Sequence, residues 1–254
     1  MIRYAALLLA GARPGGDPFA KRYGASMKAL IPIAGEPMVL RPLRALLASD
    51  RVESVRLLTQ EPDDIAAVLP DAPGWSVEPS DGTIAETLER ICADKRTRWP
   101  LLVTTADHAL LDTAMIDQFC AEAVGADLAI GVVTKSALEK RLPQSRRTWI
   151  GFRRGRYTGA NLFALGSPKA MRAVALWREV EQDRKKGWRL LLALGWPGIL
   201  GLLRLRTLDQ TLDAMSRKLG LTLRAVRLDD PLAAVDVDKP QDYDLVTAIL
   251  ERRA

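Results

Sequence analysis

The chain has 254 residues, of which 48% are hydrophobic, so it can bury a large core as one α/β domain with an insertion or as two small domains. The formal net charge of +6 favours anionic partners: nucleotides, phosphorylated substrates, acidic membranes or nucleic acid. One histidine, His108, and two cysteines without metal-type spacing, Cys92 and Cys120, exclude a zinc cluster and a histidine-dependent triad. We expect reduced, buried cysteines in a cytoplasmic protein.

The first apolar run, from Ala5 to Leu9, is typical of a buried parallel strand. It ends at Gly11 in a loop rich in Gly, Pro and basic residues. Small residues let backbone N–H groups approach a ligand closely, and basic side chains attract a polyphosphate. The loop therefore predicts a nucleotide-binding segment made of Leu9, Ala10, Gly11, Ala12, Arg13 and Lys28, with Lys21 and Arg22 nearby. Because Met1 to Tyr4 lead directly into this strand, no signal peptide is expected.

This segment resembles the signature of the MobA-like nucleotidyltransferases. In that family, a strand ending in Leu-Ala-Gly leads into a basic, Gly-rich loop and then into Lys-x-Leu-x-x-hydrophobic-x-Gly-x-Pro. Leu9 to Gly11 and Lys28 to Pro37 stand in those places. The segment contains neither the Gly-Lys-Ser/Thr of a Walker loop nor the Gly-x-Gly-x-x-Gly of a dinucleotide fold. The loop is longer than usual for the family, so either Arg13 or Arg22 fills the family's arginine position.

Strand and helix patterns then alternate. Residues 54–59 and 75–78 read as strands, with a helix from Asp63 to near Pro70 between them. This alternation predicts a mostly parallel sheet with helices on both faces, which binds ligands at the carboxyl ends of its strands.

The segment from Ser80 to Leu88 follows the third strand. Ser80 or Asp81 can cap a helix, which would place Gly82 and Thr83 in its first turn with free N–H groups. The segment resembles the family's Gly-Thr/Ser-x-Ala stretch, which contacts the base and ribose. The resemblance therefore implies that Ser80, Gly82 and Thr83 bind the nucleotide, and the alternative is an ordinary capped helix.

A further apolar strand, residues 100–105, leads directly to Asp107. A carboxylate at this edge of the sheet can hold a divalent cation that bridges nucleotide phosphates. The position matches the family's metal-binding Asp, so we predict Asp107 as a ligand of Mg²⁺; the alternative is an Asp that only begins a turn. His108 is expected to be a turn residue or a neighbour of phosphate.

The end of the chain also resembles the family. Asp236-Val237-Asp238 precedes a helix that starts at Pro240, in the place of the family's second metal-binding carboxylate or amide. Asp236 is the first candidate for this ligand, and Asp238 is the second candidate or the helix cap. The strand from Tyr157 to Leu165 resembles the acceptor half of the family's site and directs Asn161 toward the acceptor, unless Asn161 is an ordinary strand residue.

Two regions leave alternatives open. The basic run from Lys135 to Arg156 either is a solvated face or holds the phosphate of the second substrate, and nucleic acid is not expected because no aromatic stacking platform accompanies the run. Residues 171–221 predict an inserted helical subdomain with Trp177, Trp188 and Trp196. Its apolar run is too short and too interrupted to span a membrane. It either packs on the core or on the second subunit of a homodimer, or lies on a membrane surface.

The resemblance implies an α/β fold, a three-layer α/β/α sandwich of the nucleotide-diphosphosugar transferase (GT-A-like) type formed by residues 1–170 and 222–254. It also implies transfer of a nucleotidyl group from a nucleoside triphosphate, CTP ahead of GTP, to a phosphorylated small molecule with release of pyrophosphate. Lys28, Asp107 and Arg13 would be the catalytic residues. A nucleotide-sugar glycosyltransferase of related fold and a non-catalytic module at a membrane surface are the alternatives. The glycosyltransferase is disfavoured because Thr105-Ala106-Asp107 stands where Asp-x-Asp is usual.

Overall fold

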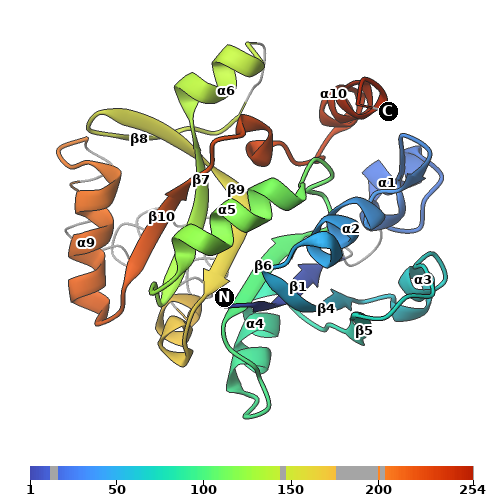
Figure 1. Cartoon of the computed structure of the whole chain (residues 1–254). Coiled ribbons are helices and arrows are strands. Elements are labelled where there is room, and N and C mark those ends of the chain that lie inside the picture. Colours follow the sequence, from blue (N-terminus) through green and yellow to red (C-terminus); the bar gives the residue numbers. More distant parts are fainter. Residues whose placement is uncertain (12–16, 144–146, 176–199, 201–203, 254) are drawn as a thin grey trace.

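The fold is built on one mixed sheet. The computed structural model describes residues 1–11, 17–143, 147–175, 200 and 204–253. In this part of the chain the sheet has eight strands, in the order β10-β7-β9-β6-β1-β4-β5 with β8 paired to β9 (Figure 1). Their bounds are β1 Tyr4–Leu9, β4 Val52–Thr59, β5 Trp75–Pro79, β6 Leu101–Thr105, β7 Leu128–Thr134, β8 Ile150–Phe152, β9 Gly155–Leu165 and β10 Leu223–Arg227.

The strands are mostly parallel. Strand β9 is the exception on the main path, because it pairs antiparallel with both β6 and β7. A small separate hairpin joins β2, Pro32–Ile33, to β3, Glu36–Pro37. The remaining neighbours on the main path, including β1 with β4 and with β6, run parallel. The parallel register places the carboxyl ends of β1, β4 and β6 at one edge of the sheet.

Helices cover both faces of this sheet, which makes the predicted three layers. Side chains of β1 alternate between two cores: Ala6 and Leu8 pack on one face, and Leu7 and Leu9 on the other. The first core includes side chains of α2, Leu40–Ala48, α5, Thr113–Ala123, and α10, Pro240–Glu251. The second includes side chains of α4, Ile84–Ala93. An apolar run without polar alternation, as in β1, is what burial on both faces requires.

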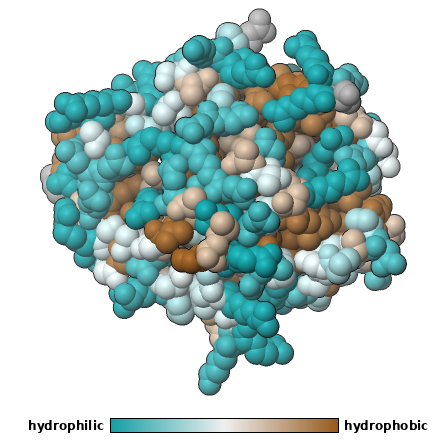
Figure 2. Space-filling view, viewed as in Figure 1, coloured by the Kyte–Doolittle hydropathy of each residue, from teal (hydrophilic) through white to brown (hydrophobic). Residues whose placement is uncertain are grey.

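The described residues form four further helices. They are α1 Pro18–Arg22, α3 Pro62–Ala66, α6 Lys135–Arg141 and α9 Leu208–Leu219, with the 3-10 turns η1 Lys28–Leu30, η2 Pro168–Ala170 and η3 Pro231–Ala234. Helix α9 packs beside β10 at one end of the sheet (Figure 1). Hydrophilic side chains predominate on the face shown in Figure 2, with small apolar patches between them.

Several local predictions need correction. Thr83 does not lie in the first turn of α4 but is its N-cap, in a capping box with Glu86. Gly82 has a φ of 83°, a left-handed conformation that cannot continue a helix, so the cap is Thr83 and not Ser80 or Asp81. Lys239, not Asp238, occupies the N-cap position of α10. Helix α3 ends at Ala66, short of the expected Pro70.

The predicted helical insertion remains a prediction. Most of residues 171–221, including Trp177, Trp188 and Trp196, lies outside the described residues; α9 is a described part of it. Among the described helices, none combines the length and the apolar character needed to cross a membrane.

Candidate functional site

A pocket opens at the carboxyl ends of β1, β4 and β6. The sequence-predicted residues that line it come from four segments. These are Leu9, Ala10 and Gly11 at the end of β1, Lys28 in η1, Ser80, Gly82 and Thr83 before α4, and Asp107 after β6. The main-chain pairing of Leu9 with Leu58 and with Thr105 brings the ends of these strands together. Eight of the predicted residues, far apart in sequence, therefore share one cavity.

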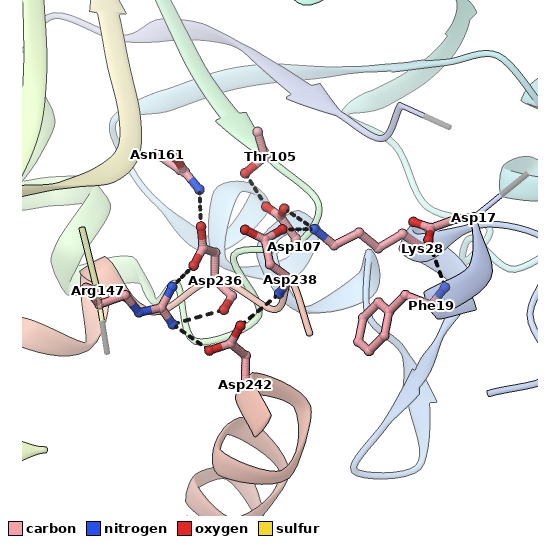
Figure 3. A network of polar contacts seen from close by, with 10 residues as sticks. All are labelled: Asp17, Phe19, Lys28, Thr105, Asp107, Arg147, Asn161, Asp236, Asp238 and Asp242. Atoms are coloured by element: carbon pink, nitrogen blue, oxygen red, sulfur yellow. Dashed lines mark hydrogen bonds and ion pairs between the residues drawn. The ribbon is translucent and has the colours of Figure 1, made fainter. Parts of the chain in front are cut away.

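Lys28 is the central cation of this site. It lies in η1, and its Nζ donates to Oδ2 of Asp107 at 2.6 Å and to Oδ1 of Asp238 at 2.5 Å (Figure 3). Burial alone would lower the pKa of Lys28, but the carboxylates of Asp107 and Asp238 outweigh it and hold the pKa above its usual value. Lys28 therefore stays protonated and can neutralise a phosphate.

Asp107 is fixed by the turn that follows β6. The hydroxyl of Thr105 donates to its Oδ1 at 2.5 Å, which leaves Oδ2 to Lys28. The carbonyl of Asp107 also accepts from the N–H of Val237 at 3.0 Å, so the turn after β6 is tied to the segment before α10. These bonds hold Asp107 next to Asp236, Asp238 and Asp242, and these four aspartates form the acidic cluster of the site.

Asp236 faces a different cation. Its carboxylate accepts from Arg147 and, at 3.3 Å, from Nδ2 of Asn161 (Figure 3). Arg147 also donates to the carbonyl of Asp236 at 3.1 Å and to Oδ1 of Asp242 at 3.3 Å. Burial raises the pKa of Asp236, and the guanidinium of Arg147 acts against this rise. Among the described residues of the basic run predicted from sequence, Arg147 enters the site.

Asn161 reaches Asp236 because β9 bulges. The pairing of β7 with β9 shifts its register between Ile130 and Val132, and Asn161 has a left-handed φ of 49°. Gly131 lies opposite the bulge, where a Cβ would come within 3.1 Å of the Leu162 Cβ. A bulge redirects a strand side chain, and asparagine tolerates a left-handed φ better than most residues do.

The acidic residues fit a hard divalent cation. Asp107 and Asp238 bind the same Nζ, so their oxygens converge on one small volume. Within the described ranges no cluster of three or more His, Cys, Asp or Glu forms a metal-binding group. Mg²⁺ is usually held by one or two carboxylates together with substrate phosphates and water, which is the donor set available here.

The residues before α4 form another wall of the pocket. The hydroxyl of Thr83 accepts from the N–H of Glu86 at 3.3 Å, while the Glu86 carboxylate accepts from the N–H of Thr83 at 2.8 Å. The buried hydroxyls of Ser80 and Thr87 lie 2.8 Å apart. The Thr83 N–H that was expected to be free is therefore occupied by Glu86.

Several residues of the site were not anticipated, and two of the predicted ones cannot be placed. Ala12 and Arg13 lie outside the described residues. Arg22 is exposed in α1 and is not among the residues that line the pocket. Asp17 was missed; it is buried in the lining and caps α1 by accepting from the N–H of Phe19 at 2.9 Å. The Asp17-Pro18 pair, a typical helix start, was the available signal.

His108 does not face the ligand space. It is only 1% exposed, and burial lowers the pKa of its imidazole to about 4, so the ring is neutral at physiological pH. Its backbone N–H donates to the carbonyl of Thr105 at 3.2 Å, which makes His108 the turn residue that the sequence suggested and not a phosphate neighbour.

The pocket lies at the carboxyl edge of a mostly parallel sheet, which is where ligands bind in folds of this kind. The family model described as "MobA-like NTP transferase domain" matches residues 6–194, which is most of the chain. The chain therefore belongs to the MobA-like NTP transferase family, and the family is one of nucleotidyltransferases.

Solved structures agree with this assignment. A hypothetical transferase from Thermus thermophilus is 30% identical, with a TM-score of 0.80 over 95% of this chain and 100% of that one. A CMP:2-keto-3-deoxy-manno-octonic acid synthetase complexed with CTP is 14% identical, with a TM-score of 0.60 over 99% of this chain and 100% of that one. A 4-diphosphocytidyl-2C-methyl-D-erythritol synthase from Anaerococcus prevotii is 10% identical, with a TM-score of 0.61 over 99% of this chain and 97% of that one. Because the last two structures have such low sequence identity to this chain, their similarity shows the fold alone. A comparison with curated proteins found no match.

Proposed function

We propose that this protein transfers a nucleoside monophosphate group from a nucleoside triphosphate, CTP ahead of GTP, to a phosphorylated small molecule and releases pyrophosphate. The observation that carries the proposal is the contact of Lys28 with Asp107 in the lining of the pocket that begins at the end of β1. A cation and a carboxylate at this place suit a triphosphate and its divalent cation.

The proposed reaction joins an oxygen of the acceptor phosphate to the α-phosphorus and breaks the bond from that phosphorus to the bridging oxygen of the leaving pyrophosphate. The nucleophile is already ionised at neutral pH, so no general base is needed, which agrees with the burial of His108. Lys28 and the backbone N–H groups near Gly11 would hold the triphosphate. Charge stabilisation and positioning supply the catalysis.

Asp107 and one of the two later aspartates would hold Mg²⁺, which when bound neutralises charge on the triphosphate oxygens. The contacts favour Asp238 as the partner of Asp107, because both share Lys28. The carboxylate of Asp236 is instead engaged by Arg147 and Asn161. Asp236, the first candidate from sequence, stays the alternative ligand if Arg147 moves when substrates bind.

The acceptor would lie on the side of the acidic cluster where β9 contributes Asn161. Arg147 is positioned there by Asp236 and Asp242 and retains N–H groups that can contact a phosphate. CTP is placed ahead of GTP because the structures of the same fold include enzymes named for cytidylyl chemistry, one of them complexed with CTP.

The test is a thermal-shift panel of CTP, GTP, UTP and ATP, each with and without Mg²⁺. A ligand that binds the folded state raises its melting temperature by mass action, by an amount that grows with the ratio of concentration to Kd. A magnesium-dependent rise for CTP supports the proposal and justifies an acceptor screen by pyrophosphate release. If only GTP raised the melting temperature, the donor would be GTP and not CTP. If no triphosphate raised it, the proposed function would be overturned.

A further inference from the structure

A second pocket lies between α6 and the hairpin of β8 and β9. Its volume is about 450 Å³, and it shares no lining residue with the pocket at the end of β1. Basic and aromatic side chains make up much of its wall: Lys135, Arg154, Arg156, Arg204, Phe152 and Tyr157. The described structure therefore divides the basic run of the sequence between two places, because Arg147 enters the acidic cluster whereas Arg154 and Arg156 line this pocket.

The second pocket carries excess positive charge. Four cationic side chains face one carboxylate, Glu139, which is paired with Lys135 at 3.1 Å. Within the described part of the chain, Arg154, Arg156 and Arg204 form no ion pair with a carboxylate. Planar guanidinium groups are suited to bind phosphate oxygens two at a time.

The walls of this pocket depend on two glycines. A Cβ at Gly155 would come within 2.7 Å of the Tyr157 hydroxyl, and one at Gly151 within 2.8 Å of Nε of Arg204. The Tyr157 ring is held further by Phe152, in an edge contact at 6.1 Å between centroids, and by the guanidinium of Arg227 at 5.6 Å. The close packing of Tyr157 and Arg204 on bare backbone marks a formed cavity.

Two of the arginines also have an unusual backbone. Arg154 has a φ of 75° and Arg204 a φ of 59°, a left-handed conformation that costs free energy in any residue with a Cβ. The N–H of Arg153 donates to the carbonyl of Arg206 at 2.9 Å, so the two strained segments are joined beside the pocket. The tight turn from β8 to β9 requires a left-handed residue, which accounts for Arg154, and the bond between Arg153 and Arg206 fixes the two segments beside the pocket.

Apolar side chains are exposed next to the basic ones. Ile150 is 48% exposed and directly precedes Gly151, on which Arg204 packs; Leu205 is 57% exposed and directly follows Arg204. With the Tyr157 ring, they offer apolar surface beside the guanidinium groups. A ligand that combines a phosphate with an apolar or aromatic portion matches both features.

We propose that this pocket is a second anion site, which binds a phosphate group attached to an apolar or aromatic portion. Arg154, Arg156 and Arg204 hold the phosphate oxygens, and Tyr157 contacts the attached group. Such chemistry is found in free organic phosphates and in the headgroup region of anionic phospholipids. The proposal is independent of nucleotidyl transfer, because it uses none of the residues of the nucleotide pocket.

Phenyl phosphate is the probe for a free ligand, measured by isothermal titration calorimetry with and without CTP and Mg²⁺. Vesicles of phosphatidylglycerol, compared with phosphatidylcholine in a sedimentation assay, are the probe for a lipid. The test variant is Arg154→Ala/Arg156→Ala. The matched control, Lys140→Ala/Arg141→Ala, removes the same charge from exposed positions of the neighbouring α6 that do not line the pocket.

We expect the test variant to bind the phenyl phosphate or the anionic vesicles at least about tenfold more weakly than the wild type, and the control variant to bind within about twofold of it. Binding of phenyl phosphate without sedimentation assigns the site to a free organic phosphate, and sedimentation with phosphatidylglycerol alone assigns it to a lipid. Equal losses in the two variants, or no binding of either probe by the wild type, overturns the proposal. The thermal shift with nucleotide, measured separately, reports on the proposed function.

Discussion

Nζ of Lys28 lies 2.6 Å from Oδ2 of Asp107, although 79 positions separate the two residues in the sequence. The contact forms because Lys28 follows the loop after β1, Asp107 follows β6, and β1 and β6 are parallel neighbours with Leu9 opposite Thr105. The cation of the predicted phosphate loop and the carboxylate of the predicted metal site are thus direct partners.

Replacing Asp107 tests its predicted role. We expect Asp107→Ala to lower turnover by at least about a hundredfold, because it removes a carboxylate from the reacting centre. The side chain is partly exposed and belongs to a turn, so circular dichroism and the melting temperature should stay near the wild-type values. Asp94→Ala, which breaks an exposed ion pair with Arg96, is the control. Turnover close to normal in Asp107→Ala would exclude Asp107 as a metal ligand.

The two capping boxes allow a matched comparison. Thr83 caps α4 beside the pocket, and Thr207 caps α9 in the same way with Gln210. Loss of such a cap costs about 1 kcal/mol, so Thr83→Ala and Thr207→Ala should lower the free energy of unfolding similarly in urea titrations. Only Thr83→Ala should also weaken nucleotide binding in the thermal-shift assay, since Thr83 lines the pocket. If both variants bound the nucleotide equally well, Thr83 would not belong to the nucleotide site.

Arg147 is expected to matter for stability as well as for the acceptor. Its guanidinium contacts the carboxylates of Asp236 and Asp242, and all three side chains are largely buried. Arg147→Ala leaves two carboxylates without this partner and should lower the free energy of unfolding by about 3 to 5 kcal/mol. Arg147→Lys should recover part of this loss, because it keeps the charge but not the planar fork.

The control for Arg147 is Arg96→Ala, which removes an arginine from an exposed pair and should change the urea midpoint little. The phosphate role is measured separately: in a kinetic assay with an identified acceptor, Arg147→Lys should raise the KM for the acceptor more than the KM for the triphosphate. If only the KM for the triphosphate rose, Arg147 would contact the triphosphate and not the acceptor, which would contradict our proposal.

The two thiols predict how stability changes at alkaline pH. Burial raises the pKa of Cys92 from 9.0 to about 11 and, together with the charge of Asp117, raises the pKa of Cys120 from 9.0 to about 12. The unfolded thiols ionise first, so the free energy of unfolding should fall as pH rises from about 9 toward 12. The double variant Cys92→Ala/Cys120→Ala should show a shallower fall in denaturant titrations. An identical slope in both proteins would show that the thiols do not contribute.

Reactivity gives an independent check on the same thiols. Both cysteines are buried and free, so a thiol reagent at neutral pH should react with them only after denaturant is added. Rapid reaction of the native protein would contradict the burial of these side chains.

Much of the fold follows from local patterns in the sequence. The unbroken apolar run of β1 predicts a strand buried on both faces, and the resemblance of the Leu-Ala-Gly and Lys-x-Leu motifs to the family's signature implies the predicted nucleotide loop. The start of α10 at Pro240 and the capping of α5 by Asp112 are equally local signals. Spacing, periodicity and cap chemistry determine such features because they depend on neighbours within one or two turns of the chain.

The tertiary structure decided which polar groups pair across the site. The sequence shows Asp236 and Asp238 two positions apart, but only folding directs Asp238 to Lys28 and Asp236 to Arg147. Folding likewise separates Arg147 from Arg154 within one basic run. Such choices depend on the register of distant strands, on the bulge at Asn161 and on the path of the loops. The reason is that the partner of each of these side chains depends on how segments remote in sequence pack together. Local sequence patterns contain no information about that packing.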